Sequence, residues 1–244
     1  MNNKLTDAIK HLIIINVILF VAPQLLKLDF TNILALHYPK NDHFGIWQYA
    51  THMFMHGSFS HILFNMYGLW AFGTPLEQMW GKNKFIFFYF SAGIGAGLVY
   101  TLVNYYQFNE IYNLFINAGL QQSEIITILE SAKTNDLRVI EYITQEQFNR
   151  IIGLYNAKAV GASGAVYGVL VAFGMYFKDA KLALIFLPIP IAAKYFIPIL
   201  IAIDVFFGMT DYSIGNIAHF AHIGGAIIGF IIAWYWKKNQ FIIN

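Results

Sequence analysis

The chain alternates between long apolar segments and short polar ones. Lys, Arg, Asp and Glu are absent from 11–26, 43–76, 85–109, 159–177 and 212–236, and 182–210 contains only Lys194 and Asp204. A helix needs about 20 consecutive apolar residues to cross the hydrocarbon core of a bilayer, which is about 30 Å thick. The pattern therefore predicts an all-α, polytopic membrane protein, a bundle of six transmembrane helices at about 9–26, 58–79, 85–106, 160–177, 185–209 and 214–236.

The composition leads to the same class of protein. Of 244 residues, 58% are hydrophobic and only 28 are charged (15 Lys and Arg, 13 Asp and Glu). Globular domains usually have about 25% charged residues, so this chain cannot cover a water-facing surface, and its hydrophobicity also excludes intrinsic disorder. A net charge of +2 provides no basic stripe for nucleic acid. The chain has no cysteine and therefore no thiol chemistry. The expected surroundings are a lipid bilayer.

One segment departs from the apolar pattern. Residues 107–158 contain ten of the 28 charges, which predicts a water-facing insertion between the third and fourth spans. Thr144 and Gln147 form a capping-box pattern, and apolar residues follow at helical spacing, so the segment should end in an amphipathic helix. The chain is then a single membrane domain, residues 1–244, interrupted by this insertion. We interpret the insertion as a spacer, with a substrate-binding element as the alternative.

The lysines predict the orientation of the chain in the membrane. Cytoplasmic loops are enriched in Lys and Arg. With the N-terminus inside, the inner segments contain Lys4, Lys10, Lys82, Lys84, Lys178, Lys181, Lys237 and Lys238, whereas the short outer loops contain only Lys27 and Lys40. We therefore expect both termini in the cytoplasm, in a bacterial inner membrane.

Three polar clusters interrupt the apolar spans, and polar groups at such depth are functional candidates. They are THMFMHGSFSHILFN at 51–65, GASGAVYG at 161–168 and AHFAHIGGAIIG at 218–229. Ser163 opens the fourth span, where the unpaired N–H groups of a helix start can stabilise a developing oxyanion. Taken alone, however, the Gly164/Gly168 pair is more typical of close helix packing than of a nucleophile.

The other two clusters supply partners for a serine. His222 in the sixth span is the preferred base, because imidazole accepts a proton near neutral pH; His219 is the less favoured choice. His61 and Asn65 are four residues apart and share a helix face, so they could bind an oxyanion. The alternative for the first cluster is a metal site of His52, His56 and His61, which lacks a nearby carboxylate.

Together these motifs resemble the rhomboid family of intramembrane serine proteases. GASGAVYG resembles the family's GxSG motif, HILFN its HxxxN motif, and AHIGGAIIG its AHxxGxxxG motif. The resemblance implies that Ser163, between Gly161 and Gly164 of the GxSG motif, is the nucleophile and that His222 is the base. It implies that His61 and Asn65 form the oxyanion hole and that Tyr167 packs on the catalytic histidine. It also implies packing glycines at Gly225 and Gly229 and structural histidines at His52 and His56.

The resemblance also implies the reaction. A serine–histidine dyad, opening to the outer side of the membrane, would hydrolyse peptide bonds in or beside the transmembrane helices of single-span and other membrane-protein substrates. No metal or other cofactor is implied, and neither Asp204 nor Asp211 is expected to act as a third member. A substrate would reach the site between the second and fifth spans. The alternatives are a catalytically inactive rhomboid-like factor that binds membrane proteins, and a small transporter with histidine proton relays.

Overall fold

The computed structural model describes residues 5–184, 187–210 and 219–239. The helices are α1 Asp7–Leu26, α2 Thr31–Leu34, α3 Gln48–Thr51, the 3-10 turn η1 His52–Phe54, α4 Phe59–Gly68, the π-helical turn η2 Leu69–Gly73, α5 Thr74–Trp80, α6 Lys82–Asn117, α7 Gln122–Ser131, α8 Leu137–Tyr142, α9 Gln145–Tyr155, α10 Ser163–Tyr176, α11 Ala193–Met209 and α12 His219–Asn239. The strands are β1 Leu36–His37, β2 Lys158–Ala159, β3 Lys181–Leu184 and β4 Leu187–Ala192. The chain is therefore mostly helical.

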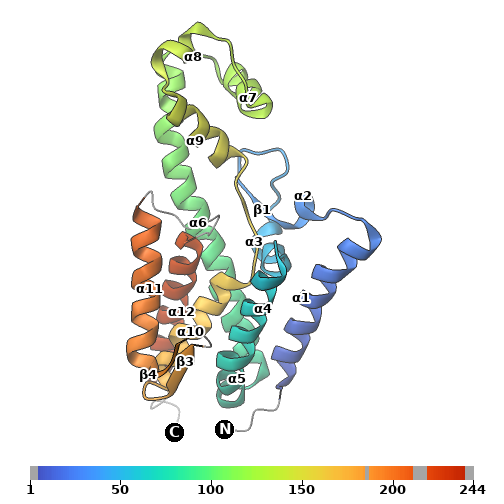
Figure 1. Ribbon diagram of the computed structural model, residues 1–244, viewed down its shortest axis with the longest axis vertical. Coiled ribbons are helices and arrows are strands. Elements are labelled where there is room, and N and C mark those ends of the chain that lie inside the picture. Colours follow the sequence, from blue (N-terminus) through green and yellow to red (C-terminus); the bar gives the residue numbers. More distant parts are fainter. Residues whose placement is uncertain (1–4, 185–186, 211–218, 240–244) are drawn as a thin grey trace.

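The lower body of the molecule is a bundle of helices (Figure 1). Helix α10 packs against both α6 and α12, which also pack against each other, and α11 lies against α12. Helix α1 lies on the other side, against α4, α5 and α6. Apolar side chains of α10, including Ala165, Val169 and Phe173, are buried in the shared core. The helix at the centre of this core is thus the one that begins at Ser163.

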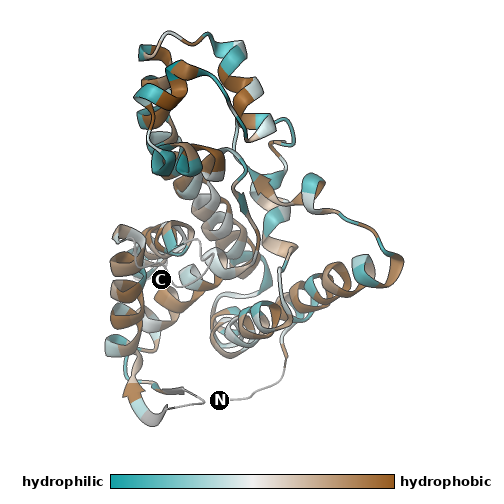
Figure 2. Cartoon of the chain, turned by 45° about the horizontal axis from the view of Figure 1, so that its top comes forward, coloured by the Kyte–Doolittle hydropathy of each residue, from teal (hydrophilic) through white to brown (hydrophobic). Residues whose placement is uncertain are grey.

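Among the described residues, three helices are long and apolar enough to cross a membrane: α1, α6 and α12. Helix α10 is also apolar but has only 14 residues. Helix α1 exposes large apolar side chains such as Ile14, Ile18 and Leu25, and Figure 2 shows that the outer faces of the bundle are largely hydrophobic. Lipid is the environment in which such an exposed apolar surface is stable.

The third predicted span is part of a longer helix. Apolar patterning predicts a span at 85–106 and an insertion from 107, but α6 continues without a break to Asn117. Its 36 residues correspond to about 54 Å, well beyond the bilayer core. The extension persists because Phe108, Ile111 and Phe115 are buried in the core of the insertion. The first residues of the predicted insertion are thus the last turns of α6, packed in the core of the insertion.

The insertion has an apolar core of its own. Ile125 and Leu129 of α7 and Ile151 of α9 pack with the end of α6, and the region rises above the bundle in Figure 1. The predicted amphipathic helix is α9, and its capping box is present: Thr144 Oγ1 accepts from the Gln147 N–H at 3.2 Å, while the Thr144 N–H donates to Gln147 Oε1 at 2.9 Å.

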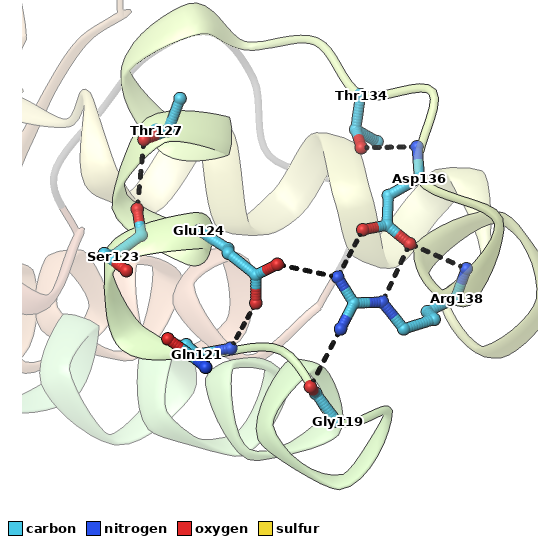
Figure 3. Close-up of polar contacts among 8 residues, drawn as sticks. All are labelled: Gly119, Gln121, Ser123, Glu124, Thr127, Thr134, Asp136 and Arg138. Carbon is cyan, nitrogen blue, oxygen red and sulfur yellow. Dashed lines mark hydrogen bonds and ion pairs between the residues drawn. The ribbon is translucent and has the colours of Figure 1, made fainter.

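Arg138 links the parts of the insertion (Figure 3). Its guanidinium donates to Asp136 at 2.7 Å, to Glu124 at 2.8 Å and to the Gly119 carbonyl at 2.9 Å. Hydrogen bonding to Arg138 holds the pKa of Asp136 below its usual value, and the Gln121 N–H, followed by Arg138, does the same for the pKa of Glu124. Because these groups are exposed, the cluster orients the α7–α8 turn more than it stabilises the chain.

The predicted fifth span begins later than expected. The prediction begins at 185, but helix α11 begins at Ala193, and the preceding segment is strand β4, paired antiparallel with β3. Proline lacks an N–H and is tolerated only in edge strands. With prolines at 188 and 190, the segment LPIPIA forms a hairpin instead of the first turns of the helix. The sixth predicted span begins at 214, and its first five residues lie outside the described part of the chain.

Glu77 fastens the first helix to the bundle. This buried carboxylate of α5 accepts from the N–H groups of Ala8 at 2.8 Å and Ile9 at 3.0 Å, and from the hydroxyl of Thr6. The first N–H groups of a helix have no intrahelical partner. Glu77 thus acts as the cap of α1, although it comes from about 70 residues along the chain.

Replacing Glu77 with alanine should therefore loosen α1. Two buried N–H groups would lose their acceptor, at a cost of about 3 kcal/mol in the free energy of unfolding. Thermal unfolding in detergent measures the loss, with Glu141→Ala, an exposed glutamate of α8, as the control. Equal stability of the two variants would contradict this account of Glu77.

Candidate active site

The turn before Ser163 is held from two sides. Strand β2 pairs with β1, with Leu36 opposite Ala159, and the Gly161 N–H donates to the His52 carbonyl at 2.9 Å. Gly161 has a φ of 120°, which L side chains rarely adopt. Ser163 follows as the first residue of α10. The loop after the first helix therefore determines where the serine lies, and His52 contributes through its backbone.

Ser163 and His222 come together from α10 and α12. The Oγ atom of Ser163 and the Nε2 atom of His222 lie 2.9 Å apart, within hydrogen-bond distance. Tyr167, one turn after the serine, stacks on the imidazole with the ring centroids 4.2 Å apart and the planes 10° apart. The sequence motifs singled out Ser163 and His222, and the family resemblance implied Tyr167. The hydroxyl of Ser163 lies where a base can accept its proton.

Asp204 of α11 joins this group, which the sequence did not predict. Its Oδ1 atom accepts from His219 Nδ1 at 2.6 Å and lies 3.1 Å from His222 Nδ1, and its Oδ2 atom accepts from the hydroxyl of Tyr167. The sequence analysis does not expect Asp204 to act as a third member, and the structure places its carboxylate beside the His222 ring. The signal in the sequence was the lone carboxylate of an apolar span, because such a group must find partners. Asp211 lies outside the described residues.

His61 and Asn65 converge on the turn that leads to Ser163. A Cβ atom added to Gly161 would lie 2.6 Å from His61 Nε2 and 3.7 Å from Asn65 Nδ2. The Nδ2 group of Asn65 is buried and has no hydrogen-bond partner among the described residues. A buried donor without a partner is costly, so this amide is available for an acceptor that approaches Ser163.

His56 lies behind His61, with the two ring centroids 5.0 Å apart. His52 is buried, and its Nδ1 atom contacts the Gln48 carbonyl at 2.8 Å. Within the described part of the chain, His52, His56 and His61 do not gather their ring nitrogens around one point, as the metal alternative requires. The geometry of this cluster favours support of the loop and of the His61 ring.

Glycines bring α10 and α12 into backbone contact. A Cβ atom added to Gly225 would lie 1.9 Å from the Gly164 carbonyl oxygen, and one added to Gly229 would lie 2.5 Å from the Gly168 Cα. Small residues permit this approach between helices. The close approach is what allows the side chains of Ser163 and His222 to reach each other.

Comparison with known protein families identifies the family of the chain. A family model described as the rhomboid domain matches residues 43–239. The chain belongs to the rhomboid family. It is 30% identical to rhomboid protease AarA of Providencia stuartii over 193 residues, 77% of this chain and 54% of that protein. It is 26% identical to the mitochondrial rhomboid protein 1 of Saccharomyces cerevisiae over 185 residues, 76% of this chain and 40% of that protein.

A third relative, rhomboid protease GlpG of Yersinia pseudotuberculosis, is 24% identical over 160 residues, covering 57% of this chain and 52% of that protein. This rhomboid chain thus spans about half of the length of these relatives, or less. Family membership and the apolar helices together make it an integral membrane protein. Its relatives include both bacterial and mitochondrial proteins.

The rhomboid chain also gathers the possible metal ligands Asp204, His219 and His222, whose ligand atoms lie within 4.8 Å of one another. Two ligand atoms of a tetrahedral zinc ion, each about 2.1 Å from the metal, are about 3.4 Å apart. The 2.6 Å separation of Asp204 Oδ1 and His219 Nδ1 is too short for that and is typical of a charge-assisted hydrogen bond. The spacing therefore fits a group joined by hydrogen bonds, in which a proton rather than a metal ion lies between Asp204 Oδ1 and His219 Nδ1.

Proposed function

We propose that this chain is an intramembrane serine endopeptidase. The observation that supports it most directly is the 2.9 Å contact between Ser163 Oγ and His222 Nε2 inside a bundle of helices with an apolar core. The proteases AarA and GlpG are among its relatives. The proposed substrate is a membrane protein, single-span or larger, that is cut in or beside a transmembrane helix.

The residues provide each step of an acyl transfer. The Ser163 proton passes to His222 Nε2 as Oγ bonds to the substrate carbonyl carbon, which leaves a tetrahedral oxyanion. Collapse breaks the C–N bond, and His222 returns the proton to the leaving amine. Water then attacks the ester, again giving its proton to His222, and the second collapse releases the acid and restores the serine. Tyr167 keeps the imidazole in plane through these steps by stacking.

The oxyanion is assigned to His61, Asn65 and the backbone N–H of Ser163. Asn65 Nδ2 is buried without a partner in the described structure, and any side chain at position 161 would collide with His61 and contact this amide. Such donors are aimed at the position where charge develops, and do not require reorganisation during the reaction.

Replacing Asn65 with alanine should lower kcat by about 100-fold, as removal of one oxyanion donor does in other serine proteases. KM should change little, because the contact strengthens only in the transition state. Steady-state cleavage of a fluorogenic membrane substrate separates the two constants. Asn104→Ala, at another buried asparagine on α6, is the control. A rise in KM at constant kcat would reassign Asn65 to ground-state binding.

The membrane arrangement that accompanies this proposal has six spans. The α4–η2–α5 segment, α10 and α11 would cross together with α1, α6 and α12. The lysine distribution then places both termini in the cytoplasm of a bacterial inner membrane, with the active site opening to the outer side. In this orientation α10 and α12 both begin at the outer side, and a common side for the two helix starts agrees with the contact between Ser163 and His222.

Substrate access is proposed between α4 and α11. Both helices expose apolar side chains, such as Phe59 and Leu63 of α4 and Ile203 and Phe206 of α11. A substrate helix hides its carbonyls in hydrogen bonds, so helix-breaking residues near the cut should favour cleavage. An inactive rhomboid-like binding factor would accept the same helices without cutting them.

One experiment tests the proposal as a whole. The purified chain in detergent is offered a single-span substrate with a Gly-Pro pair in the outer half of its span, and the products are identified by mass spectrometry. A serine-reactive fluorophosphonate is added in parallel, and the modified peptide is mapped. We expect a cut near the Gly-Pro pair and a label on Ser163. Binding of the substrate with neither cut nor label would favour the inactive factor.

A further inference from the structure

The buried carboxylate of Asp204 faces the proposed base from the side opposite the serine. Asp204 is 5% exposed and comes from α11, whereas Ser163 belongs to α10 and His222 to α12. The imidazole of His222 thus contacts Asp204 Oδ1 through Nδ1 at 3.1 Å and Ser163 Oγ through Nε2 at 2.9 Å. We infer that Asp204 is a positioning residue that makes the proposed dyad a serine–histidine–aspartate arrangement. This inference rests on the proposed function.

The carboxylate determines which nitrogen of His222 holds the proton. An ionised carboxylate only accepts hydrogen bonds, so the Nδ1 atom facing Asp204 must be the donor. In a neutral imidazole the other nitrogen is then the acceptor. Nε2, which faces Ser163, is therefore free to take the hydroxyl proton. Without Asp204 the two tautomers compete, and the Nε2–H form cannot act as the base.

Asp204 is itself held by two further donors. His219 Nδ1 donates to Oδ1 at 2.6 Å, and the hydroxyl of Tyr167 donates to Oδ2. His219 is 7% exposed and stacks on Phe207 with the ring centroids 6.0 Å apart. A carboxylate in an apolar bundle is stable only when it is hydrogen-bonded. His219 and Tyr167 supply this, so we assign His219 to the support of Asp204 rather than to proton transfer from serine.

The charge of Asp204 also matches the charge that develops in the reaction. When His222 takes the serine proton it becomes an imidazolium, with Asp204 Oδ1 next to its Nδ1–H. In a site surrounded by apolar helices, the attraction of opposite charges is stronger than in water. In soluble serine proteases the corresponding aspartate stabilises the imidazolium without taking up its proton, and the amide substitution lowers kcat by about 10,000-fold. Here Tyr167 also holds the ring, so we expect a smaller loss.

The test compares Asp204→Asn with Asp179→Asn. Asp179 forms an exposed ion pair with Lys194 at 2.9 Å, beyond the far end of α10 from Ser163, so its substitution also removes one carboxylate. In detergent, with a fluorogenic single-span substrate, we expect Asp204→Asn to lower kcat by about 100-fold with KM within about threefold, because the group acts on the transition state. Asp179→Asn should match the wild type. A kcat for Asp204→Asn within threefold of wild type would overturn the inference.

A nuclear magnetic resonance measurement on the wild-type protein tests the inference even if Asp204→Asn does not fold. With ¹⁵N-labelled histidine, and His222→Gln to assign the signals, the wild-type chain should have its His222 proton on Nδ1. A proton on Nε2 would overturn the inference whatever the variants do. Absence of cleavage by the wild type would contradict the proposed function. The position of the His222 proton would still test whether Asp204 orients the imidazole. Cleavage by Asp204→Asn at the wild-type rate would contradict the role of Asp204 but not the proposed protease function.

Discussion

Replacing Ser163 with alanine is expected to abolish cleavage. In the proposed mechanism the Oγ atom forms the covalent intermediate, and among the described residues no other hydroxyl lies within hydrogen-bond distance of His222 Nε2. In a soluble serine protease, loss of the nucleophile or of the base lowers kcat by about a millionfold, and the residual rate comes from the oxyanion hole and binding. We expect a loss of at least about 10,000-fold here. Cleavage of a single-span substrate in detergent measures it.

Two comparisons make this prediction specific. His222→Ala should cause a loss of similar size, and the double variant should be no slower than either single one, because the two residues act as a unit. Ser123→Ala removes an exposed hydroxyl of α7 in the insertion and should cleave at the wild-type rate. Substantial cleavage by Ser163→Ala would exclude the serine mechanism. Additive losses in the double variant would separate the roles of the two residues.

Replacing Gly225 with valine is expected to abolish activity through the backbone. Its Cβ atom would lie 1.9 Å from the Gly164 carbonyl oxygen, so α10 and α12 would have to move apart. The displacement would break the 2.9 Å contact between Ser163 and His222. Overpacking against a rigid backbone should cost about 3 kcal/mol or more in the free energy of unfolding.

Thermal unfolding and fluorophosphonate labelling measure the two consequences of Gly225→Val. We expect a lower unfolding temperature and no label on Ser163. Gly153→Val is the matched control, because a Cβ atom at Gly153, on the exposed side of α9, meets no atom within 4 Å. Wild-type labelling of Gly225→Val would mean that the close approach of α10 and α12 is not required for the site.

The sequence predicted much of the candidate site because its motifs are local. Ser163 and Tyr167 are separated by one helical turn, and so are His61 and Asn65, so a helix places each pair on one face whatever the tertiary structure is. Glycines at 164, 225 and 229 indicated close helix contact, and the structure has α10 and α12 in backbone contact there. The structure then brought Ser163 and His222 together over a separation of 59 residues.

At two places the conformation could not be predicted from local patterning alone. The apolar run of α6 ends near Glu110, but the helix continues to Asn117 because its last turns are buried in the insertion. The segment from 185 is apolar enough for a helix, but its prolines place a hairpin before Ala193. In both cases hydropathy predicted the environment of a segment but not its conformation.

Hydropathy and charge alone determined that this chain belongs in a membrane, since 28 charged residues cannot cover the surface of a soluble protein of 244 residues. They also left Asp204 as the one carboxylate of the fifth predicted span, and a carboxylate in such a span needs partners. Only the tertiary structure decided that these partners are His219, His222 and Tyr167, from two other helices. The physical reason is that burial cost is a property of one side chain in its segment, whereas a hydrogen bond depends on the relative positions of segments that the chain brings together only when it folds.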